Sequence, residues 1–431
     1  MIRSHAFCRY PPSPRSPVRP RAAGGSGSTL PPGPGRTFPA VRPLRSLGRF
    51  VREVRDYLRF SDLDPAARRI VFYAEDVASH GYFEGLLGRL LDSGPHPVCY
   101  FTSDPDDPIF QRSGPSLRVF YVSQLLPFLT RNLDGAVLVM TMPDLETFHV
   151  KRSRNDVNHV YLFHNIGSSF PVIRYGALFH YDTIFCVGEH HEQEIRRQEE
   201  LYDLPAKTLV PFGYYRLEKT HRDYRSHQRT EPGGEHRGRV LVAPSWGADS
   251  ILNLCGRALV RTLLDAGYEV TVRPHPMTEK HDPDLIRSLK DEFGSHPLFV
   301  YAGDISSVHP FFDADVLVSD WSGVSYEYAF GTERPVLFID VPRKVVNERH
   351  AEVGIEPVDV GIRHRIGSVL APDELDQADA RIQALRRDSE RYVHDIRKAR
   401  EELVYNFGCS SEAGAKYIRD YVNEKFADAA E

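Results

Sequence analysis

Short apolar segments rich in β-branched and aromatic residues alternate with helical or loop stretches along most of this chain, and this alternation restricts its fold more than any other feature. Six such segments lie in the first half, at residues 70–73, 97–101, 118–122, 136–140, 160–163 and 183–187. Five more follow in the second half, at residues 240–243, 269–273, 298–301, 316–319 and 336–339. Strands that alternate with helices pair in parallel, and helices cover both faces of the sheet. The alternation therefore predicts an α/β fold in which two Rossmann-like parallel-sheet domains face each other across a cleft.

Length and composition indicate the domain boundaries. At 431 residues the chain suits two domains of roughly 150–200 residues each. Residues 217–239 are polar or charged almost throughout and contain a Pro-Gly-Gly turn, which indicates a linker. We expect the first domain at residues 44–216 and the second at residues 240–372. The mostly helical remainder, residues 373–431, is expected to pack back on the first domain.

The N-terminal segment has a different composition. Residues 1–52 contain ten arginines and ten prolines but no acidic residue. Such a segment cannot bury enough apolar surface to fold, so a disordered leader is expected over residues 1–43. An organelle transit peptide is a second interpretation, against which the prolines argue, and a start codon further downstream is a third.

Residues 44–60 have apolar side chains at helical spacing and arginines on the opposite face. Two interpretations are open. The segment is either a helix that lies on an anionic membrane surface or the first helix of the domain, packed through its apolar stripe.

The segment Arg273-Pro274-His275-Pro276 ends one of the predicted strands. The two prolines stop the strand and stiffen the backbone around His275. The carboxyl ends of parallel strands are where ligands bind. Arg273 offers a bidentate fork to phosphate oxygens, and His275 can donate a hydrogen bond to a bridging or leaving oxygen. The alternative is a structural histidine that caps a turn.

A second segment, Asp320-Trp321-Ser322-Gly323, leads from a strand into an amphipathic helix. The free amides and the dipole at a helix start bind phosphate well, although a turn of this kind is often only a cap. The chain has neither the glycine fingerprint of dinucleotide-binding proteins nor a P-loop.

Four segments in the second half, residues 240–246, 273–276, 313–327 and 332–340, resemble in order and spacing the CDP-glycerol glycerophosphotransferase family. Members of that family make teichoic-acid and related polyol-phosphate polymers and have the two-domain GT-B fold. The resemblance implies a divergent member of the family with a GT-B-like fold.

The resemblance also implies roles for individual residues. It assigns the donor phosphates to Arg273, His275, Ser322, Gly323, Val324 and Ser325. It assigns the nucleotide and polyol pocket to Pro244, Ser245, Trp246, Asp320 and Glu327.

The first half is less similar to the family. His164, in the segment Phe163-His164-Asn165-Ile166-Gly167-Ser168, stands where the family has a Trp-His-Gly-Thr segment with the general base. The resemblance therefore implies that His164 and His275 are catalytic. The family's Gly-x-Pro-Arg turn is altered to Gly213-Tyr214-Tyr215-Arg216, and its usual second serine is Gly323, which indicates a branch with a different acceptor or donor.

The expected reaction is attack by an acceptor hydroxyl on the β-phosphorus of a CDP-linked glycerol or similar polyol, with release of CMP. It requires no metal and no cofactor beyond the nucleotide-linked donor. Two alternatives remain: a GT-B glycosyltransferase that uses a nucleotide sugar for capsule or other surface polysaccharide, and a non-catalytic nucleotide- or glycan-binding protein.

The expected partners follow from this chemistry. They are the nucleotide-linked donor and a polymer or lipid-linked acceptor, as in cell-wall teichoic acid synthesis. The resemblance implies a cytoplasmic protein, peripheral on the inner face of the membrane, with residues 44–60 as the candidate contact. A net charge of −5 argues against a nucleic-acid partner.

Overall fold

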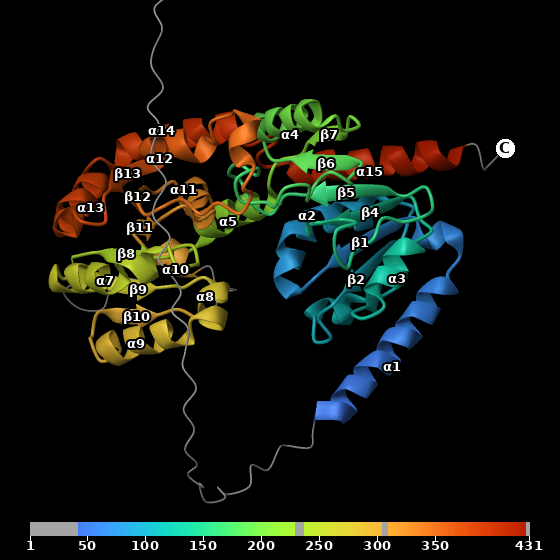
Figure 1. The fold of residues 1–431 in the computed structure, drawn as a ribbon, viewed down its shortest axis with the longest axis horizontal. Coiled ribbons are helices and arrows are strands. Elements are labelled where there is room, and N and C mark those ends of the chain that lie inside the picture. Colours follow the sequence, from blue (N-terminus) through green and yellow to red (C-terminus); the bar gives the residue numbers. More distant parts are fainter. Residues whose placement is uncertain (1–41, 229–236, 304–308, 428–431) are drawn as a thin grey trace, which may run out of the picture. The chain divides into compact units, whose positions relative to one another are not determined.

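The strands form two separate parallel sheets in the computed structural model, which describes residues 42–228, 237–303 and 309–427 (Figure 1). By its internal contacts the chain divides into two units, residues 1–46 and 47–431, and both sheets belong to the second. The predicted leader, residues 1–43, lies almost entirely outside the described residues. The predicted α/β fold with two Rossmann-like sheets is confirmed.

The first sheet has seven strands in the order β3-β2-β1-β4-β5-β6-β7. They are β1 (Ile70–Ala74), β2 (Val98–Thr102), β3 (Leu117–Tyr121), β4 (Val137–Met140), β5 (Asn158–Leu162), β6 (Thr183–Cys186) and β7 (Thr208–Pro211). The six strands expected from the sequence are confirmed, whereas β7 was not predicted. As an edge strand β7 is exposed at Thr208 and Pro211, so it lacks the continuous apolar run of the buried strands.

The second sheet has six strands in the order β10-β9-β8-β11-β12-β13. They are β8 (Arg239–Val242), β9 (Glu269–Val272), β10 (Phe299–Tyr301), β11 (Val316–Ser319), β12 (Val336–Ile339) and β13 (Gly367–Leu370). Five were predicted. The sixth, β13, escapes prediction because it begins with Gly367 and Ser368. A Cβ at Gly367 would stand 1.8 Å from the Val336 carbonyl oxygen, so this strand end tolerates only glycine.

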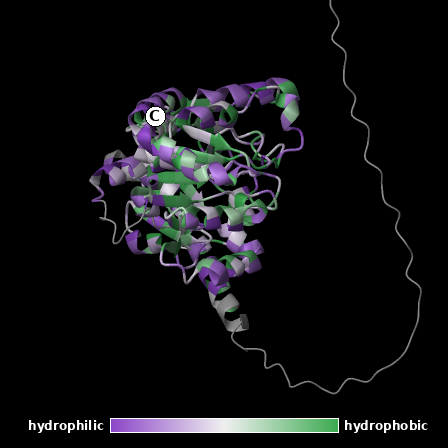
Figure 2. Ribbon diagram, turned by 90° about the vertical axis from the view of Figure 1, so that its left-hand side faces the viewer, coloured by the Kyte–Doolittle hydropathy of each residue, from purple (hydrophilic) through white to green (hydrophobic). Residues whose placement is uncertain are grey.

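Helices cover both faces of the first sheet. In β1, Ile70, Phe72 and Ala74 share a buried cluster with α2 (Val77–Ser93) and α15 (Ser410–Ala427). Val71 and Tyr73 point to the other face, which α3 (Leu126–Arg131) and α4 (Glu189–Tyr202) help to cover. Figure 2, in which the second domain faces the viewer, shows the same layering there, with mostly apolar strands inside and more hydrophilic helices outside.

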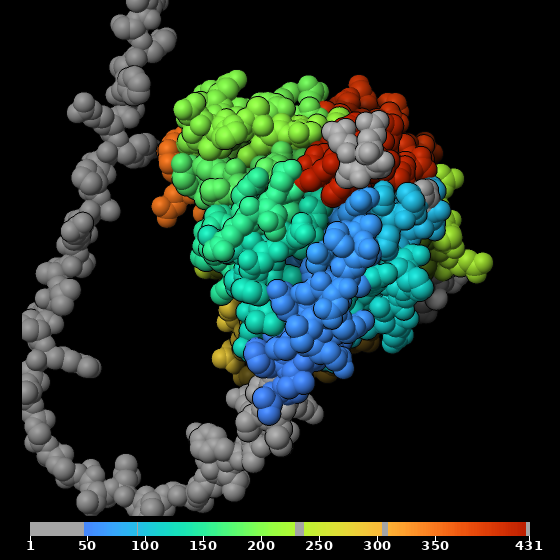
Figure 3. Space-filling model, turned by 90° about the vertical axis from the view of Figure 1, so that its right-hand side faces the viewer, coloured from blue at the N-terminus to red at the C-terminus, as the bar shows by residue number. Residues whose placement is uncertain are grey.

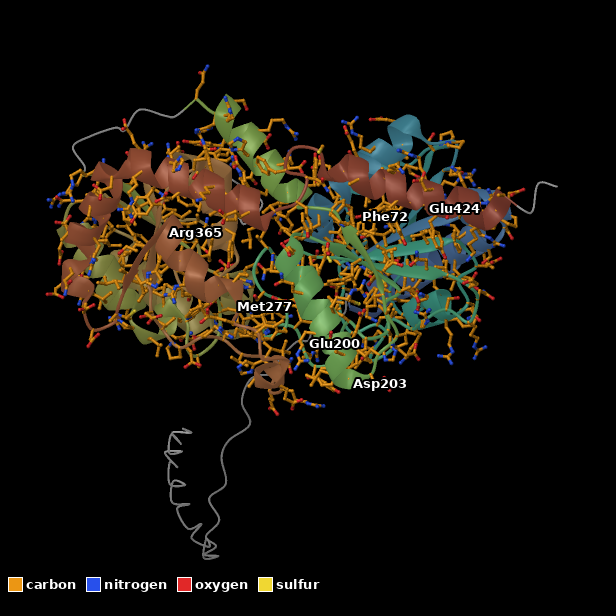
Figure 4. The ribbon with its side chains drawn as sticks, turned by 90° about the horizontal axis from the view of Figure 1, so that it is seen from above. Phe72, Glu200, Asp203, Met277, Arg365 and Glu424 are labelled. Atoms are coloured by element: carbon orange, nitrogen blue, oxygen red, sulfur yellow. The ribbon has the colours of Figure 1, made fainter. Side chains whose placement is uncertain are left out.

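The second sheet is covered in the same way. Its helices are α6 (Ile251–Leu254), α7 (Gly256–Asp265), α8 (Pro276–His281), α9 (Pro283–Phe293), α10 (His309–Asp313), α11 (Val324–Thr332), α12 (Val358–Ile366), α13 (Ala378–Arg387) and α14 (Ser389–Leu403). The last helix, α15, leaves this domain and packs against α2, beside the sheet that contains Phe72 (Figure 4).

The segment expected to be a linker, residues 217–239, is partly helical. Its first ten residues belong to α5 (Tyr215–Ser226), which packs against both α2 and α11. Leu217 is fully buried there. A polar composition therefore concealed a helix that contacts both domains, and the exact domain boundaries stay a prediction.

Helix α1 (Arg42–Ser61) covers the segment expected to be helical, and its residues from 47 on lie along the surface of the first domain (Figure 3). From residue 47 on, it packs through Glu53, Asp56 and Phe60. Glu53 accepts hydrogen bonds from the backbone N–H groups of residues 123 and 125, and Asp56 accepts one from residue 121.

The apolar stripe of α1 is on the outside. Leu47, Phe50, Val51 and Leu58 are 40–60% exposed. The expectation that this stripe packs the helix onto the domain is wrong, because two buried carboxylates hold the helix instead. No helix in the described part of the chain has the length and apolar content that a bilayer crossing needs.

Candidate active site

A cleft of about 620 Å³ opens between the two sheets. Its walls come from residues that follow the carboxyl ends of β5, β8, β9 and β11, where ligands of parallel sheets bind. Ten of the twelve residues predicted for the site line it: His164, Pro244, Ser245, Trp246, Arg273, His275, Ser322, Gly323, Val324 and Glu327. The tertiary fold thus brings together segments more than one hundred residues apart.

The other two predicted residues lie behind the wall of the cleft. Asp320 is buried and accepts hydrogen bonds from the Ser245 N–H at 2.8 Å and the Ser245 hydroxyl at 3.0 Å. The Ser325 hydroxyl donates to the Ser322 carbonyl at 2.8 Å. Both residues brace the loops that carry cleft-lining side chains.

On the donor side, His275 follows β9 and caps α8. Its Nδ1 accepts a hydrogen bond from the Met277 N–H at 3.1 Å, so a neutral ring carries its proton on Nε2. Burial, and to a lesser extent the nearby Lys344, lowers the pKa of His275 to about 4. At neutral pH the ring is therefore an uncharged hydrogen-bond donor. Arg273 beside it is 8% exposed, and its guanidinium lies 4.9 Å from the centre of the Phe311 ring.

The start of α11 completes the donor side. The helix begins at Val324, directly after Ser322 and Gly323 in the cleft wall. The first N–H groups of a helix have no acceptor within it, and the aligned peptide dipoles give this end a partial positive charge. Such an end stabilises an anion.

On the opposite wall, His164 follows β5 with its side chain exposed to the cleft. Its Nδ1 lies 3.5 Å from the Tyr161 hydroxyl, and its ring meets the Tyr82 ring edge-on at 6.0 Å. The protein atoms around the cleft shield the imidazole from bulk water and so lower the pKa of His164, and a hydrogen bond to the Thr141 backbone opposes this. The imidazole is thus unprotonated at neutral pH, as a general base must be.

An ion pair joins the two domains at the edge of the cleft. Arg216 Nε lies 3.1 Å from a carboxylate oxygen of Glu327 in α11. The Tyr214 hydroxyl is 3.0 Å from both this carboxylate and the His164 carbonyl oxygen. Glu327 therefore has partners within the protein. The turn before α5 depends on Gly213, whose φ of +101° favours glycine.

The loop that carries His164, residues 164–170, is held by hydrogen bonds to α4 of the first domain. Two adjacent histidines of α4 donate to consecutive carbonyls: His190 Nε2–H to Ile166 at 2.8 Å and His191 Nε2–H to Gly167 at 3.0 Å. Glu194 accepts hydrogen bonds from the N–H and hydroxyl of Ser169. The many charged residues of α4 are typical of a solvated helix, yet these three side chains are at most 8% exposed.

The same loop also forms hydrogen bonds with the start of α12 in the second domain. Asp359, at the start of α12, accepts a hydrogen bond from the Ser168 N–H at 3.0 Å and one from the Tyr326 hydroxyl at 2.8 Å. The Ser168 hydroxyl in turn accepts one from the Val358 N–H at 2.9 Å. The loop with the candidate base is thus held by both domains.

Several cleft-lining residues were not predicted. Tyr82, Asn165, Arg174 and Lys344 line the cleft, as does Arg216. Lys344 could have been found, because it lies shortly after the carboxyl end of the predicted strand 336–339. Asn165 could have been found for the same reason, since it closely follows the predicted strand 160–163. Tyr82, Arg174 and Arg216 lie on loops or helices whose place no sequence pattern gives.

The family description CDP-Glycerol:Poly(glycerophosphate) glycerophosphotransferase matches residues 179–344. This segment, less than half of the chain, is similar to that family. The match includes the donor side of the cleft and ends at Lys344, and it confirms the resemblance seen in the sequence motifs. His164 lies outside the matched residues. No curated protein sequence matches the chain.

Solved structures share the fold at low sequence identity. The wall teichoic acid polymerase TagF superposes with a TM-score of 0.52 at 12% identity, over 89% of this chain and 99% of that one. MnaA of S. aureus, in a structure with UDP, gives 0.53 at 13% identity over 83% and 97%. A UDP-N-acetylglucosamine 2-epimerase homologue from Listeria monocytogenes gives 0.51 at 10% identity over 85% and 98%. These likenesses establish the two-domain GT-B-like fold.

Proposed function

We propose that this protein is a transferase that moves a glycerol-phosphate unit, or a similar polyol phosphate, from a CDP-linked donor to an acceptor hydroxyl and releases CMP. The family match over residues 179–344 supports the donor class. One observation carries the proposal: a single cleft is lined by a neutral histidine of the first domain and by the anion-binding groups of the second.

The donor would bind to the wall of the second domain. Arg273 would engage diphosphate oxygens, and the His275 Nε2–H would donate to the oxygen that leaves with CMP. The N-terminus of α11, with Ser322, would stabilise the same charge. The nucleotide would lie along Pro244, Ser245 and Trp246. Glu327, which forms the ion pair with Arg216, would contact the ribose or the polyol.

The transfer would proceed by direct displacement. His164 removes the proton of the acceptor hydroxyl, and the oxygen attacks the β-phosphorus of the donor. The bond between this phosphorus and the oxygen bridging to CMP breaks, and CMP leaves with the electron pair. The protein contributes position and electrostatic stabilisation, which are the main sources of rate in phosphoryl transfer.

A donor panel tests this function. The purified protein is incubated with CDP-glycerol, CDP-ribitol and common UDP- and GDP-sugars, with polyol-phosphate acceptors present. We expect CMP release from a CDP-polyol, and a loss of at least a hundred-fold in the His164→Ala variant. Release of UDP or GDP without CMP would point instead to a nucleotide-sugar glycosyltransferase. Biological activity that survives both His164→Ala and His275→Ala would point to a binding protein.

The acceptor we propose is a polymer or a lipid-linked primer at the inner membrane surface. Helix α1 would make that contact, because Leu47, Val51 and Leu58 are exposed one to two turns apart with arginines beside them. Apolar side chains can enter the interface while arginines meet anionic headgroups.

Vesicle sedimentation tests this contact. With vesicles of phosphatidylglycerol and phosphatidylcholine, Leu47→Ser, Val51→Ser and Leu58→Ser combined should weaken binding about ten-fold or more, given the apolar area removed. Leu254→Ser, which changes a 49% exposed leucine on α6, is the matched control. Unchanged sedimentation of the triple variant would contradict the proposed contact.

A further inference from the structure

The segment that follows β12 crosses from the second domain to the first. We name residues 341–347 the strap. At its start, the Val341 carbonyl accepts a hydrogen bond from the Trp321 indole N–H at 2.8 Å. At its end, the Val346 and Asn347 N–H groups donate to the Pro171 carbonyl at 2.9 and 3.2 Å. The strap is therefore fastened at both ends.

The first-domain attachment lies next to the loop with the candidate base. The Asn347 side-chain amide donates to the Phe170 carbonyl at 2.9 Å, and Phe170 ends the loop that begins at His164. The strap thus connects the donor side of the cleft with the acceptor side by direct hydrogen bonds.

Lys344 lies in the middle of the strap and lines the cleft. Its ammonium is 3.1 Å from the centre of the Trp246 ring. The Trp246 ring in turn lies 6.1 Å from the His275 ring, centre to centre. Among the described residues, Lys344 has no carboxylate as an ion-pair partner; its close contact is the indole face.

We propose that Lys344 is a binding residue for the donor diphosphate, a third cationic or donor group beside Arg273 and His275. An aromatic face attracts a cation through the ring quadrupole, which has no net charge. The ammonium therefore keeps its full positive charge for a bound anion. A diphosphate in the cleft offers the ammonium a far stronger, charge-assisted interaction. The indole face that Lys344 leaves is then free for the nucleobase.

The fixed ends of the strap support this role. A lysine side chain loses rotamer freedom on binding, but here the backbone that carries it is already ordered. Burial lowers the pKa of Lys344, while the buried Asp320 opposes this, so the ammonium is less solvated than a surface lysine and more receptive to an anion. The identity of the nucleotide in this assignment rests on the proposed function. The binding of a diphosphate by Lys344 does not.

Calorimetric titration of the full-length protein tests the assignment, with inorganic diphosphate, CDP and cytidine as separate probes. We expect Lys344→Met to raise the Kd of diphosphate and of CDP about ten-fold or more, as loss of a charge-assisted contact does. Lys344→Arg should stay within about three-fold of the wild type, because it keeps the charge. The Kd of cytidine should not rise in either variant.

Lys398→Met is the matched control, because it removes the same charge from an exposed position on α14. Thermal melting of every variant checks the fold. Wild-type affinity for diphosphate in Lys344→Met, or no diphosphate binding by the wild type, would overturn the assignment. If diphosphate binding depends on Lys344 but CDP-polyols are not turned over, the assignment stands and the proposed donor falls.

Discussion

The carboxylate of Asp359 accepts a hydrogen bond from the backbone N–H of Ser168 at 3.0 Å, four residues after His164. This bond ties α12 of the second domain to the loop that carries the candidate base. The position of His164 relative to the donor side therefore depends on a residue that does not line the cleft.

Replacement of Asp359 tests this dependence. Asp359→Ala leaves the Ser168 N–H and the Tyr326 hydroxyl without their acceptor, at a cost of about 1–3 kcal/mol for each buried group. We expect kcat for CMP release to fall at least ten-fold while donor KM changes little. Asp359→Asn, which keeps an acceptor oxygen, should recover part of the loss. The exposed Asp373→Ala is the control, and equal losses in kcat for all three variants would contradict the positioning role.

Gly323 and Asn165 face each other across the cleft. A Cβ at Gly323 would lie 2.5 Å from the Asn165 side-chain oxygen. The family that this chain resembles carries serine at the position of Gly323 and glycine at the position of Asn165. In this chain the larger of the two side chains is therefore on the first domain instead of the second. We expect Gly323→Ser alone to raise donor KM about ten-fold, and the added change Asn165→Gly to restore it. Additive effects measured in the double-mutant cycle would show that the two positions are independent.

The ion pair between Arg216 and Glu327 connects α5 with α11. It is partly shielded from water, so we expect a coupling energy of about 1 kcal/mol, above that of most surface pairs. The measurement is a double-mutant cycle of Arg216→Met and Glu327→Gln, with the free energy of unfolding in urea as the readout. A coupling energy near zero would mean that the pair contributes nothing to domain association.

Two buried acid–base groups of α4, His190 and Glu194, predict opposite dependences of stability on pH, and burial lowers the pKa of the adjacent His191 in the same direction as that of His190. Burial lowers the pKa of His190 from 6.5 to about 4, so the unfolded chain binds the extra proton and stability falls as pH drops from 6.5 towards 4. The expected loss is about 3 kcal/mol. Burial raises the pKa of Glu194 from 4.5 to about 7, so its contribution falls as pH rises over that interval.

Two variants separate these contributions. Glu194→Gln should make the free energy of unfolding rise more steeply between pH 4.5 and 6.5 than in the wild type, because the histidine effect is then unopposed. His190→Gln should make the rise less steep than in the wild type, because only His191 then acts against Glu194. Urea unfolding at half-unit pH steps measures both, and parallel curves for all three proteins would contradict the assignment of these pKa shifts.

Strands and their carboxyl ends could be predicted because local patterns encode them. An apolar run that stops at Arg273 or Ser319 marks a sheet edge, and parallel sheets place such edges together. This is why the donor side was largely predictable. Edge strand β7 and the glycine-initiated β13 were not, since neither has a continuous apolar run.

The remaining features depend on contacts that no periodicity reveals. The outward stripe of α1 follows from Glu53 and Asp56, which bind backbone N–H groups of a loop some seventy residues away. His190 and His191 look solvated in sequence, yet they are buried because two carbonyls of another loop require donors. In each case a polar side chain satisfies distant backbone groups, and the hydrophobic pattern carries no trace of that partner.

The late position of α15 in the chain determines when one face of the first sheet is covered during translation. Ala415, Ile418 and Val422 fill the same buried cluster as Phe72 and Phe83, although more than three hundred residues separate them. A ribosome therefore completes the whole second sheet before it delivers the helix that closes the first. The face of the first sheet that α15 helps to cover therefore stays partly open until the second sheet has been synthesised.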